Sequence, residues 1–463
     1  MSPDGVARLL RSIIPDPFVI AIGLTAAAFA VALVFSVIWG EGTPMELVQA
    51  WVSGWTPEGA PANARPIGGL WSLLTFAMQM CLILVTGFVV ANTRPVQRIL
   101  GALAWFATGP RTAIVLVASV AMSLALVNWG VGLIAGALLA REVGFSLKEK
   151  GIKAHYPLLA AAGYLGLAVW HGGLSGSAPL KVTSKANLDE VLGSALSAHI
   201  DVLPLTATIL SPRNLIVTLC VAIVMTSILV WLVPKDPASR TEAPDRPASN
   251  ADEESWAPGI AGRLERSPWV SGILVVLITA WFVPWLWQGG WRALSPDSMN
   301  LCFLGVGLAL AGGPVAYMRH AKRGAEACAG IIVQFPLYGG ILGILAAGGL
   351  VGLIADALPT SAWGLSLSTF LSAGLVNLFV PSGGGQWTVQ GPMVMQAAAK
   401  SGVDPGRVVL ALAWGDQWTN LFQPFWALPL LGITGTKAGD LLGPTMLAGV
   451  GAGVVFAAGA ALF

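Results

Sequence analysis

Between two apolar segments, this 463-residue chain carries the sequence Leu375-Val-Asn-Leu-Phe-Val-Pro-Ser-Gly-Gly-Gly-Gln-Trp-Thr-Val-Gln-Gly-Pro392. The stretch is rich in glycine and amide side chains and is broken by proline. Backbone of this kind cannot face lipid, because its free N–H and C=O groups need partners. At membrane depth it is expected only where protein or a water-filled cavity supplies those partners, so such a stretch usually marks a site.

The composition is that of a polytopic membrane protein. Hydrophobic residues make up 55% of the chain and charged residues 10%, against roughly 25% charged residues in an average soluble domain. We therefore expect an all-α fold in a lipid bilayer. The net charge of +2 gives no indication of a nucleic-acid partner.

Apolar stretches long enough to span, at about 20 residues per helix, lie near residues 17–39, 68–92, 154–172, 212–233, 268–288, 298–318, 327–356, 406–432 and 441–463.

Two further apolar stretches, near 112–140 and 364–399, are each too long for one helix and too short for two full spans. Each is interrupted near its middle by a Val-Asn pair, at Asn128 and at Asn377. We therefore predict two re-entrant helical hairpins. Related breaks in two halves of a chain indicate an inverted-repeat secondary transporter with its substrate site between the breaks.

The predicted organisation has two repeats joined by a linker. Residues 1–233 form the first repeat, 268–463 the second, and the hydrophilic, Pro-rich segment 234–267 a flexible cytoplasmic linker. Basic residues cluster around the first hairpin, so the positive-inside rule places both of its ends in the cytoplasm. Five predicted crossings separate the hairpins, so the second should enter from the opposite side. Lys400 and Arg407 weigh against this topology, because they would lie outside.

The tip of the second hairpin is the main candidate for substrate binding. Consecutive glycines permit backbone conformations closed to other residues and let a ligand approach the main chain. Helix N-termini beside the break would direct N–H groups toward an anion, and helix C-termini would suit a cation. The alternative is that small residues only allow close helix packing. The candidate residues here are Asn377, Ser382, Gly383, Gly384, Gly385, Gln386 and Gln390, with Asn128 at the other tip.

Each hairpin is followed by an apolar span that is itself broken, by Trp170-His-Gly-Gly-Leu-Ser-Gly-Ser-Ala-Pro-Leu180 and by Gly415-Asp-Gln-Trp-Thr-Asn-Leu-Phe-Gln-Pro-Phe425. Half-helices that face each other would form a cavity near the midplane. The alternative is a pair of Gly and Pro kinks whose polar groups satisfy freed backbone. The possible hydrogen-bond donors in these breaks are Ser175, Ser177, Thr419, Asn420 and Gln423.

Two ionisable residues in the breaks are candidates for ion or proton coupling. A carboxylate at membrane depth is costly unless it is paired, protonated or ion-bound, so Asp416 is a functional candidate by default. His171 is the second candidate, although a histidine beside Gly-Gly is more often a hydrogen-bonded structural residue. The four His and four Cys are too scattered to indicate a metal site.

Other polar and aromatic residues have simpler interpretations. Lys181, Lys185, Asp189 and Glu190 fall in a hydrophilic stretch that we interpret as a solvated loop. Tryptophans adjoin the predicted breaks, where they would wall a small cavity, although packing alone explains each of them equally well. These are Trp129, Trp170, Trp387 and Trp418.

The two motifs 376–392 and 170–179 resemble those of the AtoE-type short-chain fatty acid transporter family, and the order of segments is similar over essentially the whole chain. The resemblance implies transport of small monocarboxylates such as acetoacetate or butyrate across a bacterial cytoplasmic (inner) membrane. The family is similar to a broader group of ion transporters. That likeness implies a homodimer in which a scaffold domain supports a moving transport domain with two opposed hairpins, and hence an elevator motion. No cofactor is implied beyond a coupling H⁺ or Na⁺.

The sequence therefore favours a carrier of short-chain fatty acid anions, held at the tips by backbone N–H, hydroxyl and amide donors. Neutral donors suffice for one negative charge, and neither predicted tip contains Arg or Lys. One alternative is a carrier of the same fold for an amino acid or a larger carboxylate. Another is a membrane-embedded enzyme, for which Asp416 and His171 form the one candidate pair. A passive channel is disfavoured, because no ring of charge or filter-like repeat is visible.

Overall fold

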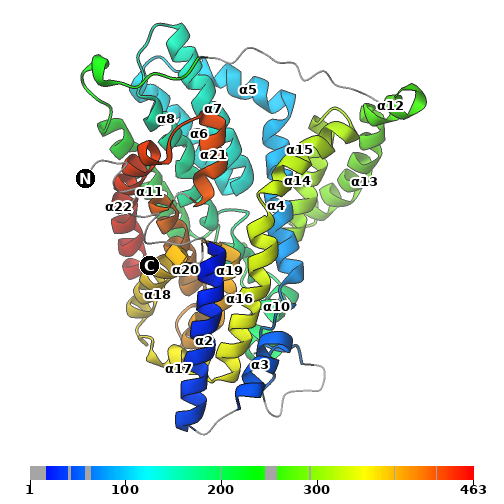
Figure 1. Ribbon diagram of the computed structural model, residues 1–463, viewed down its shortest axis with the longest axis vertical. Coiled ribbons are helices and arrows are strands. Elements are labelled where there is room, and N and C mark those ends of the chain that lie inside the picture. The colour runs from blue at the N-terminus through cyan, green and yellow to red at the C-terminus, as the bar shows by residue number, and fades with distance from the viewer. Residues whose placement is uncertain are drawn as a thin grey trace.

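The computed structural model describes residues 17–39, 43–57, 64–198, 200–245, 258–290, 294–379, 381–423 and 425–463. Within these ranges the fold is helical throughout (Figure 1), and the one β-type pairing is an isolated bridge between Trp55 and Ile67. Nine helical segments of the described chain are long and apolar enough to cross a membrane. The predicted all-α polytopic membrane protein is confirmed.

The long helices differ in how much of their surface other helices cover. In α7 83% of the most apolar window is buried, whereas in α13 the share is 11% and in α2 17%. Helix α7 is therefore central, and α2 and α13 present apolar side chains outward, as lipid-facing helices do. The long helices are α2 (Pro17–Trp39), α4 (Leu74–Asn92), α6 (Pro110–Val127), α7 (Trp129–Glu149), α11 (Pro212–Trp231), α13 (Pro268–Trp287), α16 (Ala329–Ala347) and α22 (Ala438–Leu462).

Helices α6 and α7 form a helical hairpin with its tip at Asn128. There the backbone leaves the helical region (φ −151°, ψ 120°), and the Asn128 side chain accepts a hydrogen bond from the N–H of Val131, which caps α7. The arms approach closely because Gly132 lies against the backbone of Ala125. The predicted break is thus present. Both arms extend beyond the predicted limits of 112 and 140, because each helix continues into polar residues, and the prediction followed apolar residues only.

Helices α18 (Ala362–Phe379) and α19 (Gly383–Ser401) form the second hairpin. Gln386 Nε2 donates to the carbonyl of Ala373 (2.8 Å), and Gln390 Nε2 donates to Ser372 Oγ (2.8 Å), so amide side chains fasten one arm to the other. The base of this hairpin lies beside α17 (Leu350–Ala357), at the end of the molecule opposite to α5 (Arg94–Ala104) and the base of the first hairpin (Figure 1).

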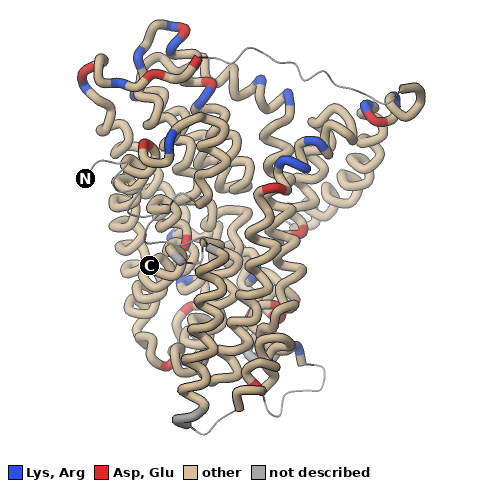
Figure 2. The backbone as a smooth tube through the Cα atoms, in the orientation of Figure 1, with Lys and Arg blue, Asp and Glu red and all other residues tan. Residues whose placement is uncertain are grey.

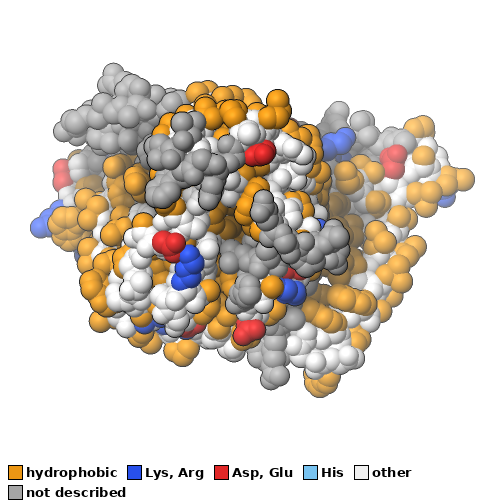
Figure 3. Space-filling model, turned by 90° about the horizontal axis from the view of Figure 1, so that it is seen from below, with side chains coloured by type: hydrophobic (Ala, Val, Ile, Leu, Met, Phe, Trp, Pro, Cys, Tyr) orange, Lys and Arg blue, Asp and Glu red, His pale blue; other side chains and the backbone are white. Residues whose placement is uncertain are grey.

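Charged residues are densest at the end of the molecule that contains α5 and α15 (Pro314–Glu326), and they are sparser through the rest of the fold (Figure 2). Many of the basic residues lie at this end, as the positive-inside rule requires of a cytoplasmic end. At the other end, Lys400 pairs with Asp356 (2.5 Å) and Arg213 pairs with Asp404. Lys400 and Arg407 still weigh against the predicted topology, because the positive-inside rule counts Lys and Arg rather than net charge. Viewed from that end, the surface carries many hydrophobic side chains around its rim (Figure 3).

Four predicted spans are interrupted in the structure. The prediction of one span at 298–318 is wrong: α14 (Pro296–Leu310) and α15 are separate, because Gly312 and Gly313 have positive φ angles of 82° and 159°. Likewise Gly349 (φ 70°) divides 327–356 into α16 and α17. The other two interruptions were predicted. They separate α8 (Tyr156–Tyr164) from α9 (Ser177–Lys181), and α20 (Pro405–Thr419) from α21 (Leu428–Thr434).

Parts of the hydrophilic segments contact the helices. Within the linker, Thr241 accepts from the N–H of Tyr156 (2.8 Å) and Asp245 pairs with Lys148 (2.7 Å), so residues 241–245 dock on α7 and α8. Linker residues 246–257 lie outside the described residues. The remaining helices are α3 (Pro44–Ser53), α10 (Lys185–Ser197) and α12 (Gly259–Glu265), with 3₁₀ turns at Leu165–Ala168, Trp170–Gly172, Leu205–Ala207, Pro237–Ser239, Asn420–Phe422 and Phe425–Ala427.

The solvated loop predicted around Lys181 is also wrong. The Lys181 side chain is fully buried, and its Nζ lies 2.5 Å from Glu190 Oε2 and 4.3 Å from the centre of the Phe76 ring. Glu190 Oε1 accepts from the N–H of Phe76 (3.1 Å), so the carboxylate also satisfies one of the N–H groups in the first turn of α4 that have no partner within the helix. Each charge thus has a partner, which is what permits burial.

Candidate functional site

The two hairpin tips and the two broken spans converge on one small cavity. Its volume is about 20 Å³, which is room for roughly one water molecule. The first hairpin contributes Trp129, the second contributes Ser382 to Gly384, and the first break contributes Trp170 and Ser177. None of the lining residues is charged. We call this cavity the tip pocket; it is lined by Met80, Trp129, Leu167, Trp170, Ser177, Ile331, Ser382, Gly383, Gly384 and Trp426.

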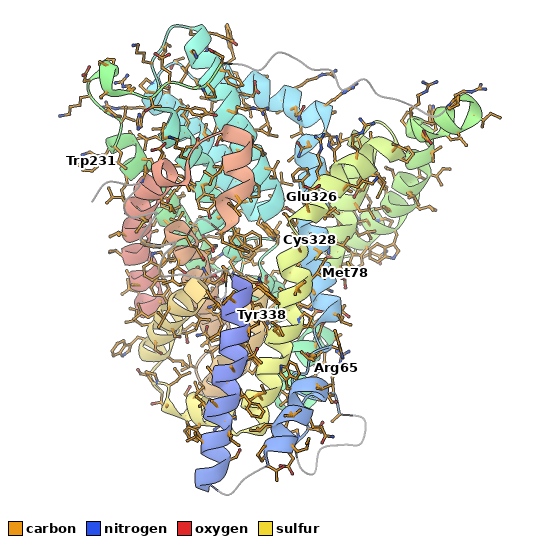
Figure 4. All side chains as sticks on the ribbon, viewed as in Figure 1. Arg65, Met78, Trp231, Glu326, Cys328 and Tyr338 are labelled. Atoms are coloured by element: carbon orange, nitrogen blue, oxygen red, sulfur yellow. The ribbon has the colours of Figure 1, made fainter. Side chains whose placement is uncertain are left out.

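The three glycines Gly383 to Gly385 have ordinary helical backbone conformations and pack tightly against their neighbours. Ser382 caps α19 by accepting from the N–H of Gly385, and Gly383 to Gly385 form the first helical turn without positive φ angles. A Cβ at Gly383 would lie 2.8 Å from His171 Cε1, and one at Gly385 would lie 2.4 Å from Tyr338 Cδ2. Tyr338 lies at mid-height on α16 (Figure 4). The expectation of special conformations is therefore wrong, and close approach explains the glycines.

Beneath Gly383, the two coupling candidates are in direct contact. His171 Nδ1 lies 2.5 Å from Asp416 Oδ2, and both side chains are almost completely buried. The other ring nitrogen, Nε2, lies 3.0 Å from the N–H of Ala178, which can only donate. Nε2 therefore accepts, the proton of the neutral ring is on Nδ1, and that N–H donates to Asp416.

Asp416 has unused bonding capacity. Its Oδ1 is buried and has no hydrogen-bond partner among the described residues. Gln417, the next residue, fixes the loop of His171 by accepting from the N–H of His171 (2.9 Å) and of Gly172 (3.3 Å). No group of three or more potential metal ligands occurs within the described ranges. The arrangement can thus hold or release a proton, or offer one carboxylate oxygen to a cation.

The amide candidates of the second half form a separate buried cluster. Asn377 Nδ2 donates to Thr419 Oγ1 (2.9 Å) and to Asn420 Oδ1 (3.0 Å). Gln423 Nε2 donates to the carbonyl of Asn377 (3.1 Å), and Asn420 Nδ2 reaches the carbonyl of Leu167 in the other broken span (3.0 Å). The cluster joins the second hairpin to both breaks. Asn377 Oδ1 remains unpartnered within the described protein.

The remaining candidates hold the tips in place. The side chain of Asn128 is occupied as the cap of α7, and Ser175 Oγ accepts from the N–H of Trp129 (3.0 Å). Gln386 and Gln390 join the arms of the second hairpin, as described above. Only four of the sequence-predicted binding residues line the tip pocket, namely Ser177, Ser382, Gly383 and Gly384.

Trp426 is a site residue that the sequence reasoning missed. Its Nε1 donates to the carbonyl of Pro381 at the second tip (2.9 Å), and its ring packs edge-on against Trp129 at the first (centroids 5.2 Å apart). Met80 and Gln417 were also missed. Gln417 belongs to the Gly415–Phe425 motif, so its position beside Asp416 was an available signal; nothing in the local sequence distinguishes Trp426 or Met80.

The chain resembles known transporters in both sequence and fold. The profile of a family described as short chain fatty acid transporter matches residues 4–463. A relative from Escherichia coli (strain K12), provisionally named a short-chain fatty acid transporter, is 35% identical over 463 residues and covers 99% of this chain and 98% of its own. A relative from Haemophilus influenzae with the same provisional name is 34% identical over 442 residues, covering 94% and 93%.

The crystal structure of the Alcanivorax borkumensis YdaH transporter matches the fold with a TM-score of 0.56 at 14% identity, covering 97% of this chain and 98% of that one. The helical architecture, the family match and the named relatives define a multi-pass membrane protein of the transporter class. More particularly, the chain belongs to the short-chain fatty acid transporter family. Its relatives are named as transporters rather than enzymes.

Proposed function

We propose that this protein is a secondary active carrier of short-chain fatty acid monocarboxylates, such as acetoacetate or butyrate, in a bacterial inner membrane. The observation that carries the proposal is the tip pocket, where both hairpin tips meet in an apolar, tryptophan-walled space with hydroxyl groups and without a charged lining residue. Such a site suits one negative charge, because a dicarboxylate would call for Arg or Lys. Membership of the family supports the same substrate class.

We propose that His171 and Asp416 couple transport to H⁺ or Na⁺. The pair lies next to Gly383, which lines the tip pocket, so a change of charge at Asp416 acts directly on the second hairpin tip. The unpartnered Oδ1 offers a place for a proton or for one ligand to a cation. Uptake of labelled acetate, butyrate and acetoacetate with the two ion gradients imposed separately distinguishes the ions.

The proposed motion is an elevator movement in a homodimer built from two inverted repeats. What supports it is that the hairpins have their bases at opposite ends of the molecule while their tips share one pocket (Figure 1). Secondary carriers built from inverted repeats hold their substrates in this way, near the midplane at the repeat interface. Cross-linking across the predicted dimer in native membranes tests the assembly.

The substrate proposal is tested by uptake of labelled butyrate into proteoliposomes. Ser382→Ala removes a hydroxyl that lines the pocket, and Asn377→Ala removes the centre of the amide cluster; both should reduce uptake in folded protein. Ser401→Ala is the matched control, since Ser401 is at the opposite end of α19. Unchanged uptake in both variants contradicts the site. Stabilisation of purified protein by amino acids, but not by C2 to C6 acids, would favour the alternative carrier.

A further inference from the structure

Two of the residues that line the tip pocket carry a hydrogen-bond donor without a partner. The side chains of Trp129 and Trp170 are 5% and 7% exposed, and both line the pocket, with ring centroids 5.9 Å apart. The Nε1 atom of each is buried and has no hydrogen-bond partner among the described residues. An indole N–H can only donate, and leaving such a donor buried and unpaired is costly.

Several other tryptophans show that the fold can pair an indole N–H. Trp414 Nε1 donates to Asn214 Oδ1 (3.1 Å), Trp418 Nε1 to the carbonyl of Gly449 (2.7 Å), and Trp426 Nε1 to the tip of the second hairpin. Trp51 and Trp387 also have unpartnered Nε1 atoms, but neither lines the tip pocket. Two tryptophans from separate elements, each with an unpartnered Nε1, therefore line the cavity that both hairpin tips share.

We propose that the indole N–H groups of Trp129 and Trp170 bind the carboxylate of the substrate, one donor for each oxygen. This inference rests on the proposed function and names the residues of the same pocket that recognise the charged group. A carboxylate accepts on both of its oxygens, so two neutral donors on neighbouring rings, tilted by 57°, match it without a counter-charge.

Several neighbours of Trp129 favour an anion, whereas the Asp416 carboxylate beneath Gly383 favours one only when it is protonated or bound to a cation. Trp129 is the first residue of the 21-residue helix α7, so its ring sits at the positive end of a long helix dipole. Ser177 and Ser382 also line the pocket; the Ser177 hydroxyl donates only to the thioether of Met80 (3.4 Å), and the Ser382 hydroxyl accepts from the N–H of Gly385 (3.3 Å). The pocket holds about one water molecule, so the two hairpin tips must move apart before a carboxylate can enter it.

The test removes the N–H groups while the rings are kept. Trp129 and Trp170 are replaced singly by 3-benzothienylalanine, which has nearly the shape of tryptophan but no N–H, and in parallel by phenylalanine (Trp129→Phe, Trp170→Phe). Trp387→Phe is the matched control, because it removes an unpartnered buried N–H outside the pocket. The readouts are KM for butyrate uptake by the full chain in proteoliposomes and binding of butyrate and of neutral butyramide to purified protein.

Loss of one hydrogen bond to a charged group should raise KM about 10-fold. Butyrate binding should weaken by the same factor, with butyramide binding and the Trp387→Phe control little changed. Unchanged KM in both benzothienyl variants overturns this inference and leaves the proposed function standing. A wild-type protein that neither binds nor transports any C2 to C6 acid overturns both. If the phenylalanine variants fail to fold, the near-isosteric variants decide the outcome.

Discussion

His171 Nδ1 and Asp416 Oδ2 lie 2.5 Å apart although 245 residues separate them in the sequence, and their contact joins the two broken spans of the protein. The side chains of His171 and Asp416 are 0% and 1% exposed to solvent. Because the ring also accepts a hydrogen bond from Ala178, its orientation and its tautomer are both fixed.

Removing the charge of this pair should uncouple transport. Asp416→Asn keeps the shape of the side chain and can still accept from His171, so we expect the protein to fold and bind substrate. Gradient-driven accumulation should fall at least about 10-fold, because no ionisable group remains at this position. Uptake under imposed H⁺ or Na⁺ gradients measures the effect, with His320→Gln as a control at a histidine outside the site. Full accumulation by Asp416→Asn would exclude the pair from coupling.

The glycines of the second tip should tolerate no side chain. Gly385→Ala places a methyl group 2.4 Å from the Tyr338 ring, and overpacking of this kind costs typically about 1–3 kcal/mol. Gly383→Ala places its methyl group 2.8 Å from His171 Cε1 instead, and it should reduce butyrate uptake more than it lowers the melting temperature. Gly432→Ala is the control, because nothing lies within 4 Å of its added methyl group. Melting temperatures and butyrate uptake measure the two effects; equal behaviour of all three variants would contradict close packing.

The buried pair of Lys181 and Glu190 should be needed as a pair. Lys181→Met leaves a buried carboxylate without its cation, which costs about 3–5 kcal/mol. Adding Glu190→Gln removes the orphaned charge while an amide oxygen can still accept from Phe76, so the double variant should recover much of the loss. Thermal unfolding in detergent compares the variants. If the single variant is as stable as the wild type, the charges are not buried together in solution.

Trp426 should control the size of the acid that is accepted. It lines the tip pocket and also a second cavity of about 570 Å³ between α2, α4, α16 and α21. Trp426→Ala removes the ring that both spaces share and should shift preference from butyrate toward longer acids. Competition of C2 to C10 acids against labelled butyrate measures the shift. Trp287→Ala is the control, because that side chain is 91% exposed.

Much of the architecture could be predicted because lipid restricts the backbone. The break at Asn128 and the interruption before Ser177 were visible as polar residues in apolar segments. The break at Gly312 was missed because glycine is apolar enough to continue a hydropathy pattern, and only its positive φ reveals the turn.

The composition of the site was harder to predict than its location. Local sequence singled out His171 and Asp416 as candidates but could not show that they touch, since the contact depends on how two halves of the chain pack. Trp426 was missed because 19 tryptophans make any one of them uninformative. Lys181 was misplaced because charge in a sequence predicts exposure, and its buried partners lie on α10 and α4.

The hydrogen bond from Ala178 to His171 has a consequence for the energetics of transport. Because Nε2 accepts that bond, Asp416 Oδ1 is the oxygen of the pair that has no partner among the described residues, and it is the place that we propose for a coupling H⁺. One proton carried with one monoanion moves no net charge. A proton-coupled cycle of this kind is electroneutral, so we expect a membrane voltage set by valinomycin and K⁺ to leave the rate of butyrate uptake unchanged.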